Sequence, residues 1–452
     1  MKEKGTSLVW LALTIFIVMG ILAIVIDIGI LQNYRVQMQT AADAAALAGA
    51  RKLPYENNAY QAAIDMMAFY DIKNGEGGVE VECVRNPDGV HSSWYKVQIT
   101  KTSELYFAPA AFDTKIAKVQ VSATASYISS LPLYISSSLS QYGTNGIQNL
   151  SCFGPYSRYT YGDAYSTLYL DDGTDNSRYN PLGYNFLVNV KPDYFTKNGT
   201  NDIVFQVFDP DCWNIGNAQD AGPGKVDEIR DSPPAVHNPS SKYTSTRYQL
   251  FAPDSTPVNY DDDSLIAEAI WTPGMIASDM EWTTPTGWSL NLGVYGYGSY
   301  RINVKTIGGS SENGFNLRAG SPEACYGTWF PNNGTEIMAI GVLPINFNQS
   351  GVIAIDLGYI PPEAGGSTVF VTKFDTDVGA KSILYSDTLG HTWSGTLAGN
   401  GTFKTDELTI PSGYAGSKLK AEFTSGAQDT SSWSLAFDGQ LSWLPGELRL
   451  ID

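Results

Sequence analysis

Acidic side chains gather where several apolar runs of this sequence give way to loops. Three runs show the pattern: residues 204–208 lead to Asp209 and Asp211, residues 248–251 lead to Asp254, and residues 369–374 lead to Asp375 and Asp377. Calcium takes six to eight hard oxygen ligands at about 2.3 to 2.6 Å, and strand-end carboxylates can supply them. The sequence therefore predicts a calcium site with these candidate ligands: Asp171, Asp172, Asp175, Asp209, Asp211, Asp254, Asp261 and Asp263.

An alternative reading of each acidic cluster is a solvated turn. Aspartate and asparagine favour turns because their side chains hydrogen-bond to the nearby backbone. None of the clusters fits the twelve-residue EF-hand loop. Both readings stay open for each cluster.

Motifs for catalysis are absent from the sequence. Its histidines, His91, His237 and His391, stand outside any nucleophile motif, and the sequence holds no Gly-x-Ser-x-Gly elbow, phosphate-binding glycine loop or His-Glu-x-x-His. Paired carboxylates can hydrolyse glycans, but a chain this rich in aspartate contains many accidental pairs. We expect a protein that is not an enzyme.

Aromatic residues crowd the stretch between residues 271 and 300. Exposed tryptophan and tyrosine rings stack on sugars, so the stretch favours glycan binding; the same rings could instead fill a core or a contact between domains. The residues are Trp271, Trp282, Trp288, Tyr295, Tyr297 and Tyr300.

Short alternating strands must position these residues. From about Ile128 onward apolar and polar residues alternate between glycine, asparagine and aspartate turns, as in 186–190, 300–304, 419–423 and 433–437. This pattern predicts antiparallel β-sandwiches. About 320 residues exceed one such core, so we expect two sandwich domains, 131–322 and 323–452, with a boundary at 319–322 or alternatively at 361–366.

A small α/β module is expected before the sandwiches, over residues 32–130. An alanine-rich helix runs to about Leu53, where Pro54 stops it. A second helix is predicted over 58–73, and strands over 79–84, 94–100 and 118–127. Residues 105–112 form a short helix or loop between the last two strands. The whole chain is thus mainly β, or α+β.

The N-terminus has the features of a membrane anchor, residues 1–31. Lys2 and Lys4 precede an apolar run from Leu8 to Ile26, which as a helix reaches roughly 28 Å and matches a bilayer core of about 30 Å. The positive-inside bias places the lysines in the cytoplasm and the remainder outside. A cleaved signal would have a shorter apolar region, and a buried soluble helix would need an apolar partner. Residues expected in the anchor and in helix packing are Leu8, Trp10, Phe16, Gly20, Ile26, Asp27, Gly29, Ala41, Ala42 and Ala45.

The anchor, Asp27-Ile28-Gly29, Tyr34-Arg35-Val36-Gln37 and the run AADAAALAGA at 41–50 together resemble TadE/TadG-like proteins of the Flp (tight adherence) pilus machinery. The resemblance covers about the first 130 residues. Lys4-Gly5 is similar to a prepilin cleavage junction, but Trp10 stands where pilins carry glutamate, which favours an uncleaved, TadG-like anchor. Residues 136–138 lack the aspartate of a von Willebrand factor A metal site.

Composition narrows the partners. A formal net charge of −18 with 28 lysines and arginines argues against nucleic acid. Four cysteines, Cys83, Cys152, Cys212 and Cys325, permit two disulfides with three pairings, or free buried thiols. No Cys/His cluster indicates structural zinc.

Two functions follow from these patterns. The first is a single-pass membrane protein, TadG-like, acting as a minor pilin or pilus-assembly component with an exported β-rich ectodomain. Its partners would be other pilin-like or Tad secretion components, and small residues on its helix would help it pack against theirs. The second is a calcium-dependent adhesin or receptor for surface glycans that carries a pilin-like anchor.

Overall fold

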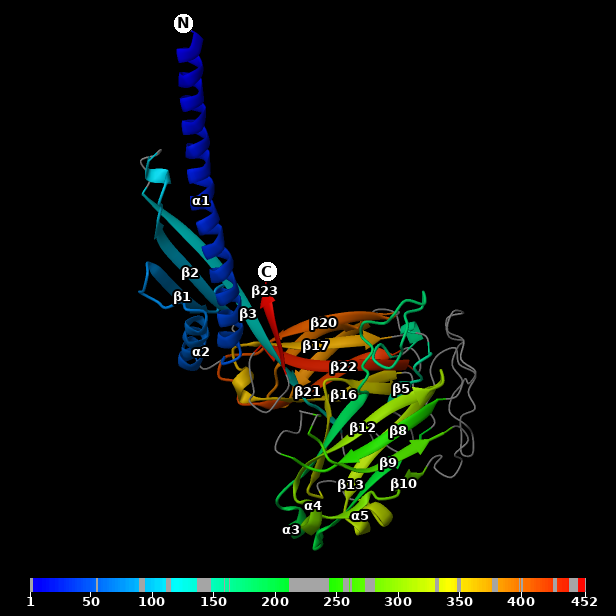
Figure 1. Cartoon of the computed structure of the whole chain (residues 1–452). Helices are drawn as coiled ribbons and strands as arrows, with labels where there is room; N and C mark the ends of the chain where they lie inside the picture. The colour runs from blue at the N-terminus through cyan, green and yellow to red at the C-terminus, as the bar shows by residue number, and fades with distance from the viewer. Residues whose placement is uncertain are drawn as a thin grey trace. The chain divides into compact units, whose positions relative to one another are not determined.

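The computed structural model describes most of the chain (Figure 1). The described residues are 3–53, 56–88, 94–110, 115–135, 148–157, 159–161, 163–210, 244–254, 260, 262–272, 281–329, 333–347, 351–375, 381–397, 399, 401–425, 429–438 and 446–451. Contacts group these residues into two compact units. Unit 1 holds the chain up to Ser129 together with the C-terminal strand, and unit 2 runs from Ser130 to Phe437.

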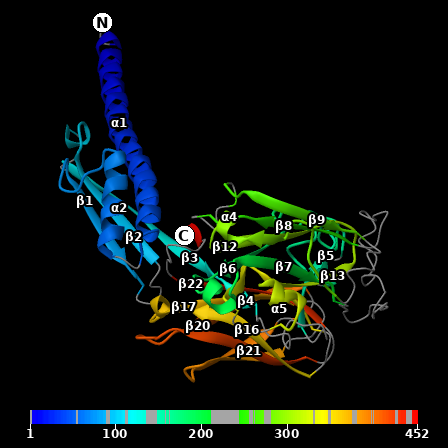
Figure 2. The same cartoon turned by 90° about the horizontal axis from the view of Figure 1, so that it is seen from below.

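Unit 1 combines two helices with an antiparallel sheet. The helices are α1 (Glu3–Ala50) and α2 (Glu56–Phe69), and a short 3-10 turn, η1 (Ala108–Ala110), lies between two of the strands. The sheet has the order β1-β2-β3-β23. Its strands are β1 (Val79–Arg85), β2 (Trp94–Glu104), β3 (Ile116–Leu131) and β23 (Gly446–Ile451). Figures 1 and 2 show the C-terminal half of α1 packed with α2 on one face of this sheet.

The core of unit 1 explains the alanine-rich composition of α1. Ala42 and Ala46 are fully buried beside Ala59 and Ala63 of α2 and Val97 of β2. Alanine has the highest helix propensity and its methyl group lets elements approach closely. The alanine run therefore forms a helix and packs it directly onto α2 and the sheet.

Unit 2 is built from short antiparallel strands in three sheets. The longest has the order β20-β17-β22-β15-β5-β13-β7, with β10 and β11 also paired to β7; the second is β4-β14-β6-β12-β8-β9 and the third β16-β21-β18-β19. Figure 2 shows the β8-β9-β12 side and the β16-β21 side of this unit at different levels.

The strands of unit 2 have the following bounds: β4 (Leu133–Ile135), β5 (Gln148–Phe153), β6 (Tyr184–Val190), β7 (Asp202–Phe208), β8 (Ser245–Phe251), β9 (Leu265–Trp271), β10 (Trp282–Thr283), β11 (Ser289–Asn291), β12 (Gly298–Gly308), β13 (Glu312–Gly320), β14 (Thr335–Ile340), β15 (Leu343–Phe347), β16 (Gly351–Ile360), β17 (Thr368–Asp375), β18 (Lys381–Asp387), β19 (Thr392–Leu397), β20 (Thr402–Thr409), β21 (Ser417–Ser425) and β22 (Asp429–Asp438). Short helical segments are η2 (Tyr159–Tyr161), α3 (Tyr194–Asn198), α4 (Leu292–Tyr295), α5 (Pro322–Tyr326) and η4 (Pro362–Ala364).

The long sheet of unit 2 packs against both of the others. Phe315 on β13 meets Phe186 of the β6 sheet edge to face, with ring centroids 5.7 Å apart. Farther along the same sheet, Phe347 on β15 and Trp433 on β22 meet Phe423 of β21, at 5.7 and 6.0 Å. One sheet thus contributes to two sandwich-like cores.

The fold class is confirmed: a long apolar N-terminal helix precedes mostly antiparallel strands. The predicted strands correspond to β1, β2, β3, β6, β12, β21 and β22, within a few residues. The second predicted helix, 58–73, is α2, which begins and ends earlier, and Pro54 lies outside the described residues. The predicted boundary at 322/323 precedes β14, which still pairs with β4 and β6, so strands on either side of it share sheets.

Candidate functional site

The apolar part of α1 is exposed in the chain itself. Among the described residues, α1 is the one helix long and apolar enough to cross a membrane, over Leu8–Ala50. Leu8, Trp10, Phe16 and Ile26 are 47 to 79% exposed, which for large apolar side chains calls for a nonaqueous environment or a partner. The predicted anchor residues thus lie on a single helix with open faces.

Asp27 follows this apolar run and is the exception on α1, because it is only 4% exposed. Its carboxylate accepts three backbone N–H groups from the segment between β2 and β3. Tyr106 N lies 3.0 Å from Oδ1, while Phe107 N and Ala108 N lie 3.0 and 2.6 Å from Oδ2. These donors stand at the start of η1, where backbone N–H groups lack helical partners. The carboxylate satisfies all three and ties the segment to α1.

An apolar groove flanks this contact, with a volume of about 670 Å³. It is lined by Ile26, Gly29, Ile30, Asn33, Tyr34, Tyr106 and Phe107. Lys101 places its ammonium 4.0 Å from the centre of the Tyr34 ring, in cation-π geometry. We name Asp27 and residues 106–108 the helix latch. The sequence singles out Asp27 by its place after the apolar run, but nothing local identifies its donors some eighty residues away.

The small residues of α1 have two different surroundings. Ala41, Ala42 and Ala45 are fully buried in the core of unit 1, so the chain's own residues cover them. A side chain added at Gly20 or Gly29 would meet nothing within 4 Å. Packing of this helix against helices of other proteins stays a prediction. Within the described residues, the part of α1 that is open for such packing lies near Gly20 and Gly29.

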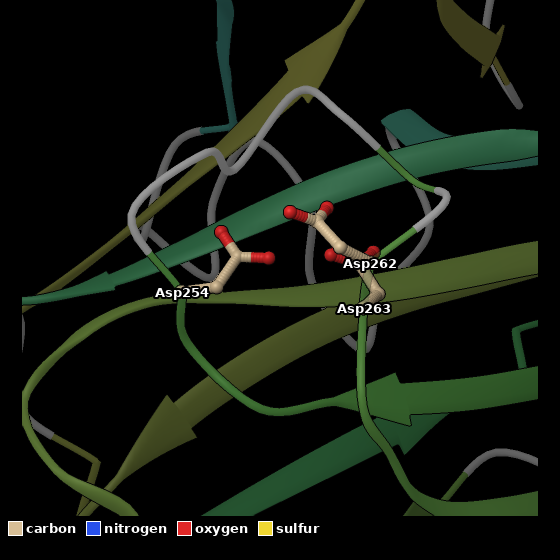
Figure 3. Close-up of side chains that lie close together, drawn as sticks. All are labelled: Asp254, Asp262 and Asp263. Carbon is tan, nitrogen blue, oxygen red and sulfur yellow. The ribbon is translucent and has the colours of Figure 1, made fainter.

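One group of the predicted metal ligands does come together. Asp254 and Asp263 lie with Asp262 so that one oxygen of each falls within 4.8 Å of the others (Figure 3). Asp254 follows β8 and the other two precede β9, so the β8–β9 connection brings them together. Asp262 was not among the predicted ligands, and its neighbour Asp261 lies outside the described residues.

Arg301 competes for this acidic cluster. Its Nε and Nη2 both contact Oδ2 of Asp263, whose side chain is 3% exposed. Nη1 donates to Asn185 Oδ1 at 2.8 Å, and the guanidinium lies 3.8 Å from the centre of the Phe251 ring. Burial and the hydrogen bond with Asp254 raise the pKa of Asp263 to about 6, although Arg301 opposes the shift. A proton shared between two carboxylates, or a cation, would relieve their repulsion.

Among the described residues, none of the remaining predicted ligands joins this cluster. Asp172 accepts from Thr174 N at 3.0 Å and Thr174 Oγ1 at 2.7 Å, as a local turn does. Asp171 accepts from the hydroxyl of Thr160, and the backbone of Asp175 forms an isolated antiparallel β-bridge with Tyr169. Asp209 follows β7, and Asp211 lies outside the described residues. Among the residues that the structure describes, no other group of three such ligands is close enough to share an ion.

The aromatic stretch is divided between core and surface. Trp288 and Tyr300 are fully buried and Trp271 is 8% exposed, whereas Tyr295 and Tyr297 are 41 and 40% exposed. Three of the six aromatic residues predicted to stack on sugars, Trp271, Trp288 and Tyr300, therefore lie in the interior of unit 2.

The cysteines and histidines give no reactive centre in the described part of the chain. Cys83 and Cys325 are free thiols, Cys152 lies 3.7 Å from Asn313 O, and Cys212 is outside the described residues. Burial raises the pKa of the Cys325 thiol to about 11, which disfavours the reactive thiolate. His391 contacts Asp387 at 2.8 Å, while His91 and His237 fall outside the described ranges.

Comparison with known families bears on α1. Residues 5–52 match the Tad family, described as Flp pilus-assembly TadE/G-like. The resemblance seen in the sequence is thus confirmed for this segment, which holds the apolar run, Asp27 and the alanine-rich stretch. No curated protein matches the chain.

Solved structures offer only distant likenesses. A Cry1Da tryptic core variant of Bacillus thuringiensis is 8% identical over 54% of this chain and 51% of its own, with a TM-score of 0.16. The CBM22-1-CBM22-2 tandem domain of Paenibacillus barcinonensis Xyn10C is 10% identical over 81% and 92%, with a TM-score of 0.15. The VP2 subviral particle of infectious bursal disease virus is 14% identical over 73% of this chain and 75% of its own, with a TM-score of 0.16. The chain spans about half the length of the Cry1Da variant and of another match, the insecticidal delta-endotoxin Cry8Ea1 of Bacillus thuringiensis. Scores this low support no conclusion about fold or function.

Proposed function

We propose that this chain is a membrane-anchored, non-enzymatic component of a Tad-type pilus system, a TadG-like minor pilin or assembly component. Its β-rich part would lie outside the cytoplasm and make extracellular contacts. The family match over residues 5–52 and the exposed apolar helix support this proposal. Lys2 and Lys4 before the apolar run favour an N-terminus in the cytoplasm.

The observation that carries the proposal is the double use of α1. Its first half is exposed and apolar, while its second half supplies Ala42, Ala45 and Ala46 to the core of unit 1. A removable targeting segment has no need of tertiary contacts, whereas cleavage after the alanine run would remove the centre of this core. The helix latch adds a second tie directly after the apolar run. The proposed anchor and the rest of unit 1 are therefore joined through one continuous helix.

The test must weaken the anchor and leave the module intact. Phe16 and Met19 are 79 and 65% exposed, so Phe16→Lys with Met19→Lys disturbs no contact of unit 1. Each lysine near the middle of a membrane helix costs about 2.5 to 3.5 kcal/mol on insertion scales. We expect the double variant to leave the membrane and pilus fractions of cells, whereas the control, Phe16→Leu with Met19→Leu, stays in both. Equal membrane and pilus association of the lysine variant would contradict the proposal.

A second candidate function, a calcium-dependent adhesin or glycan receptor, is favoured by the cluster of Asp254, Asp262 and Asp263. Three carboxylates offer up to six oxygens of the kind calcium binds, although Arg301 already holds one of them. Calorimetric titration of the full chain in detergent with CaCl2, before and after chelation, tests the ion. Asp254→Asn with Asp262→Asn is the matched variant, since it spares the partner of Arg301. Binding heat that is present in the wild type and absent in this variant, together with chelator-sensitive binding on a glycan array, would favour the receptor. Absence of heat in the wild type would exclude this function.

A further inference from the structure

A lysine and an aspartate meet inside unit 2, between the long sheet and the β16-β21-β18-β19 sheet. Lys373 on β17 has a side chain with 0% exposure, and Asp406 on β20 has 8%. In the β17–β20 register Lys373 stands opposite Lys404 and Asp406 opposite Val371, so the two side chains are diagonal neighbours on adjacent strands. Lys373 Nζ is in direct contact with Asp406 Oδ2.

The facing sheet directs two donors at the same carboxylate oxygen. Tyr385 on β18 donates its hydroxyl to Asp406 Oδ2 at 2.8 Å, and the Thr396 N–H on β19 lies 3.1 Å from Oδ2 and 3.4 Å from Oδ1. The Tyr385 oxygen is also 3.1 Å from Lys373 Nζ. Gly395 completes the enclosure, because a side chain there would overlap both the Asp406 carboxylate and the Tyr385 ring. Donors converging on one oxygen are the arrangement that stabilises a developing oxyanion.

Burial changes the chemistry of the pair. Taking an ammonium and a carboxylate out of water is costly even when they touch, and desolvation lowers the pKa of Lys373, although Asp406 opposes the shift. A buried lysine is readily converted to the neutral amine, which is a nucleophile. Proton transfer within the pair gives that amine and a carboxylic acid, held in contact and away from bulk water. Such fixed proximity can replace a very high concentration of reactants.

We propose that Lys373 and Asp406 condense to an intramolecular isopeptide bond. The Nζ lone pair attacks Asp406 Cγ, and the negative charge that develops on Oδ2 is held by the Tyr385 hydroxyl and the Thr396 N–H. The C–Oδ1 bond then breaks, and Oδ1 leaves as water with two protons that began on the ammonium. One proton stays on the amide nitrogen, so atoms and charge balance without an oxidant, a reductant or another reactant. The product links β17 to β20 covalently and removes a buried ion pair.

Mass spectrometry of the full chain purified in detergent tests the bond. We expect tryptic digestion to leave the Lys373–Phe374 bond uncut and to yield residues 319–381 joined to residues 405–418. The joined peptide should be lighter than the sum of its parts by one water molecule. Separate peptides with a cut after residue 373, recovered from folded wild-type protein, would overturn the proposal without any variant being needed.

Variants separate the bond from the ion pair. Lys373→Arg keeps the charge, but its guanidinium stays protonated, so we expect the full sequence mass, cleavage after residue 373 and a separate peptide of residues 405–418. Asp406→Asn can form the same amide by releasing ammonia. Tyr385→Phe removes one donor to Oδ2 and should slow accumulation of the joined peptide after synthesis about tenfold or more, as loss of one oxyanion donor does elsewhere. A joined peptide in the Lys373→Arg variant would assign the link to other residues and overturn the proposal.

Discussion

Asp27 in unit 1 and Asp263 in unit 2 are both shielded carboxylates, but they are stabilised by different partners. Asp27 has three backbone N–H donors, and in the described part of the chain its hydrogen-bond partners include no lysine or arginine. Asp263 has a buried guanidinium on one side and a second carboxylate on the other. Backbone donors are fixed in number and do not titrate, whereas a carboxylate neighbour makes the charge depend on pH or on a cation. The first arrangement suits a permanent structural tie, and the second suits a site that responds to its surroundings.

We expect Asp27→Ala to destabilise unit 1 most strongly. Three N–H groups would lose a charged acceptor, and hydrogen bonds to charged groups contribute about 1.5 to 3 kcal/mol each. Water can replace part of this at a segment with exposed side chains, so we expect a loss of about 3 kcal/mol in local stability. Hydrogen exchange in detergent should show faster exchange at residues 106–108.

Asp27→Asn is the matched control, because its single carbonyl oxygen can still accept from part of the set. Its exchange should fall between those of the wild type and Asp27→Ala. Unchanged exchange in Asp27→Ala would mean that packing alone holds the segment on α1.

We expect a smaller effect from Gly49→Ala, which tests packing at the other end of α1. The added methyl would overlap the ring of Tyr95, a buried residue of β2. Overpacking a core typically costs 1 to 3 kcal/mol, and we expect about 1 to 2 kcal/mol in the free energy of unfolding of unit 1, measured by chemical denaturation in detergent.

Gly29→Ala supplies the control for this substitution on the same helix. Nothing lies within 4 Å of the added methyl, and alanine is favoured over glycine in helices by about 1 kcal/mol. It should leave stability unchanged or raise it. Equal effects of the two substitutions on stability would show that contact with Tyr95 does not decide the outcome.

The smallest effect is the pH response of the Asp263 site. Its folded pKa of about 6 lies above its ordinary value of 3.8, so the folded chain binds more protons than the unfolded chain between these values. This contribution to stability is fully present below pH 3.8 and is lost as pH rises through 6. Thermal unfolding of wild type and Asp254→Asn from pH 4 to 7 measures it.

Asp254→Asn removes the like charge and should flatten this part of the profile. If the cluster binds calcium, the added ion should also flatten the profile by stabilising the folded chain at pH 7, since a cation would replace the shared proton. Identical profiles for wild type and variant would show that Asp254 does not influence the titration.

Much of this protein could be predicted from local sequence. The apolar run, the alanine stretch and the alternating strands each have a period that identifies the element, and β6, β12, β21 and β22 lie where that period places them. The boundary between sandwiches could not be predicted in this way. Glycine and proline at 319–322 mark a turn, but β14 beyond it pairs back to β4 and β6, and strand pairing is decided by residues far apart in the chain.

Neighbouring residues alone predict that α1 forms, that its first half is apolar enough for a membrane and that most of the remainder is strand. Which polar groups meet depends on the tertiary fold. Asp27 with residues 106–108, Asp263 with Arg301, and Lys373 with Asp406 all join segments that are distant in sequence. A carboxylate's partners depend on how the sheets and helices pack, and composition and spacing do not reveal this packing.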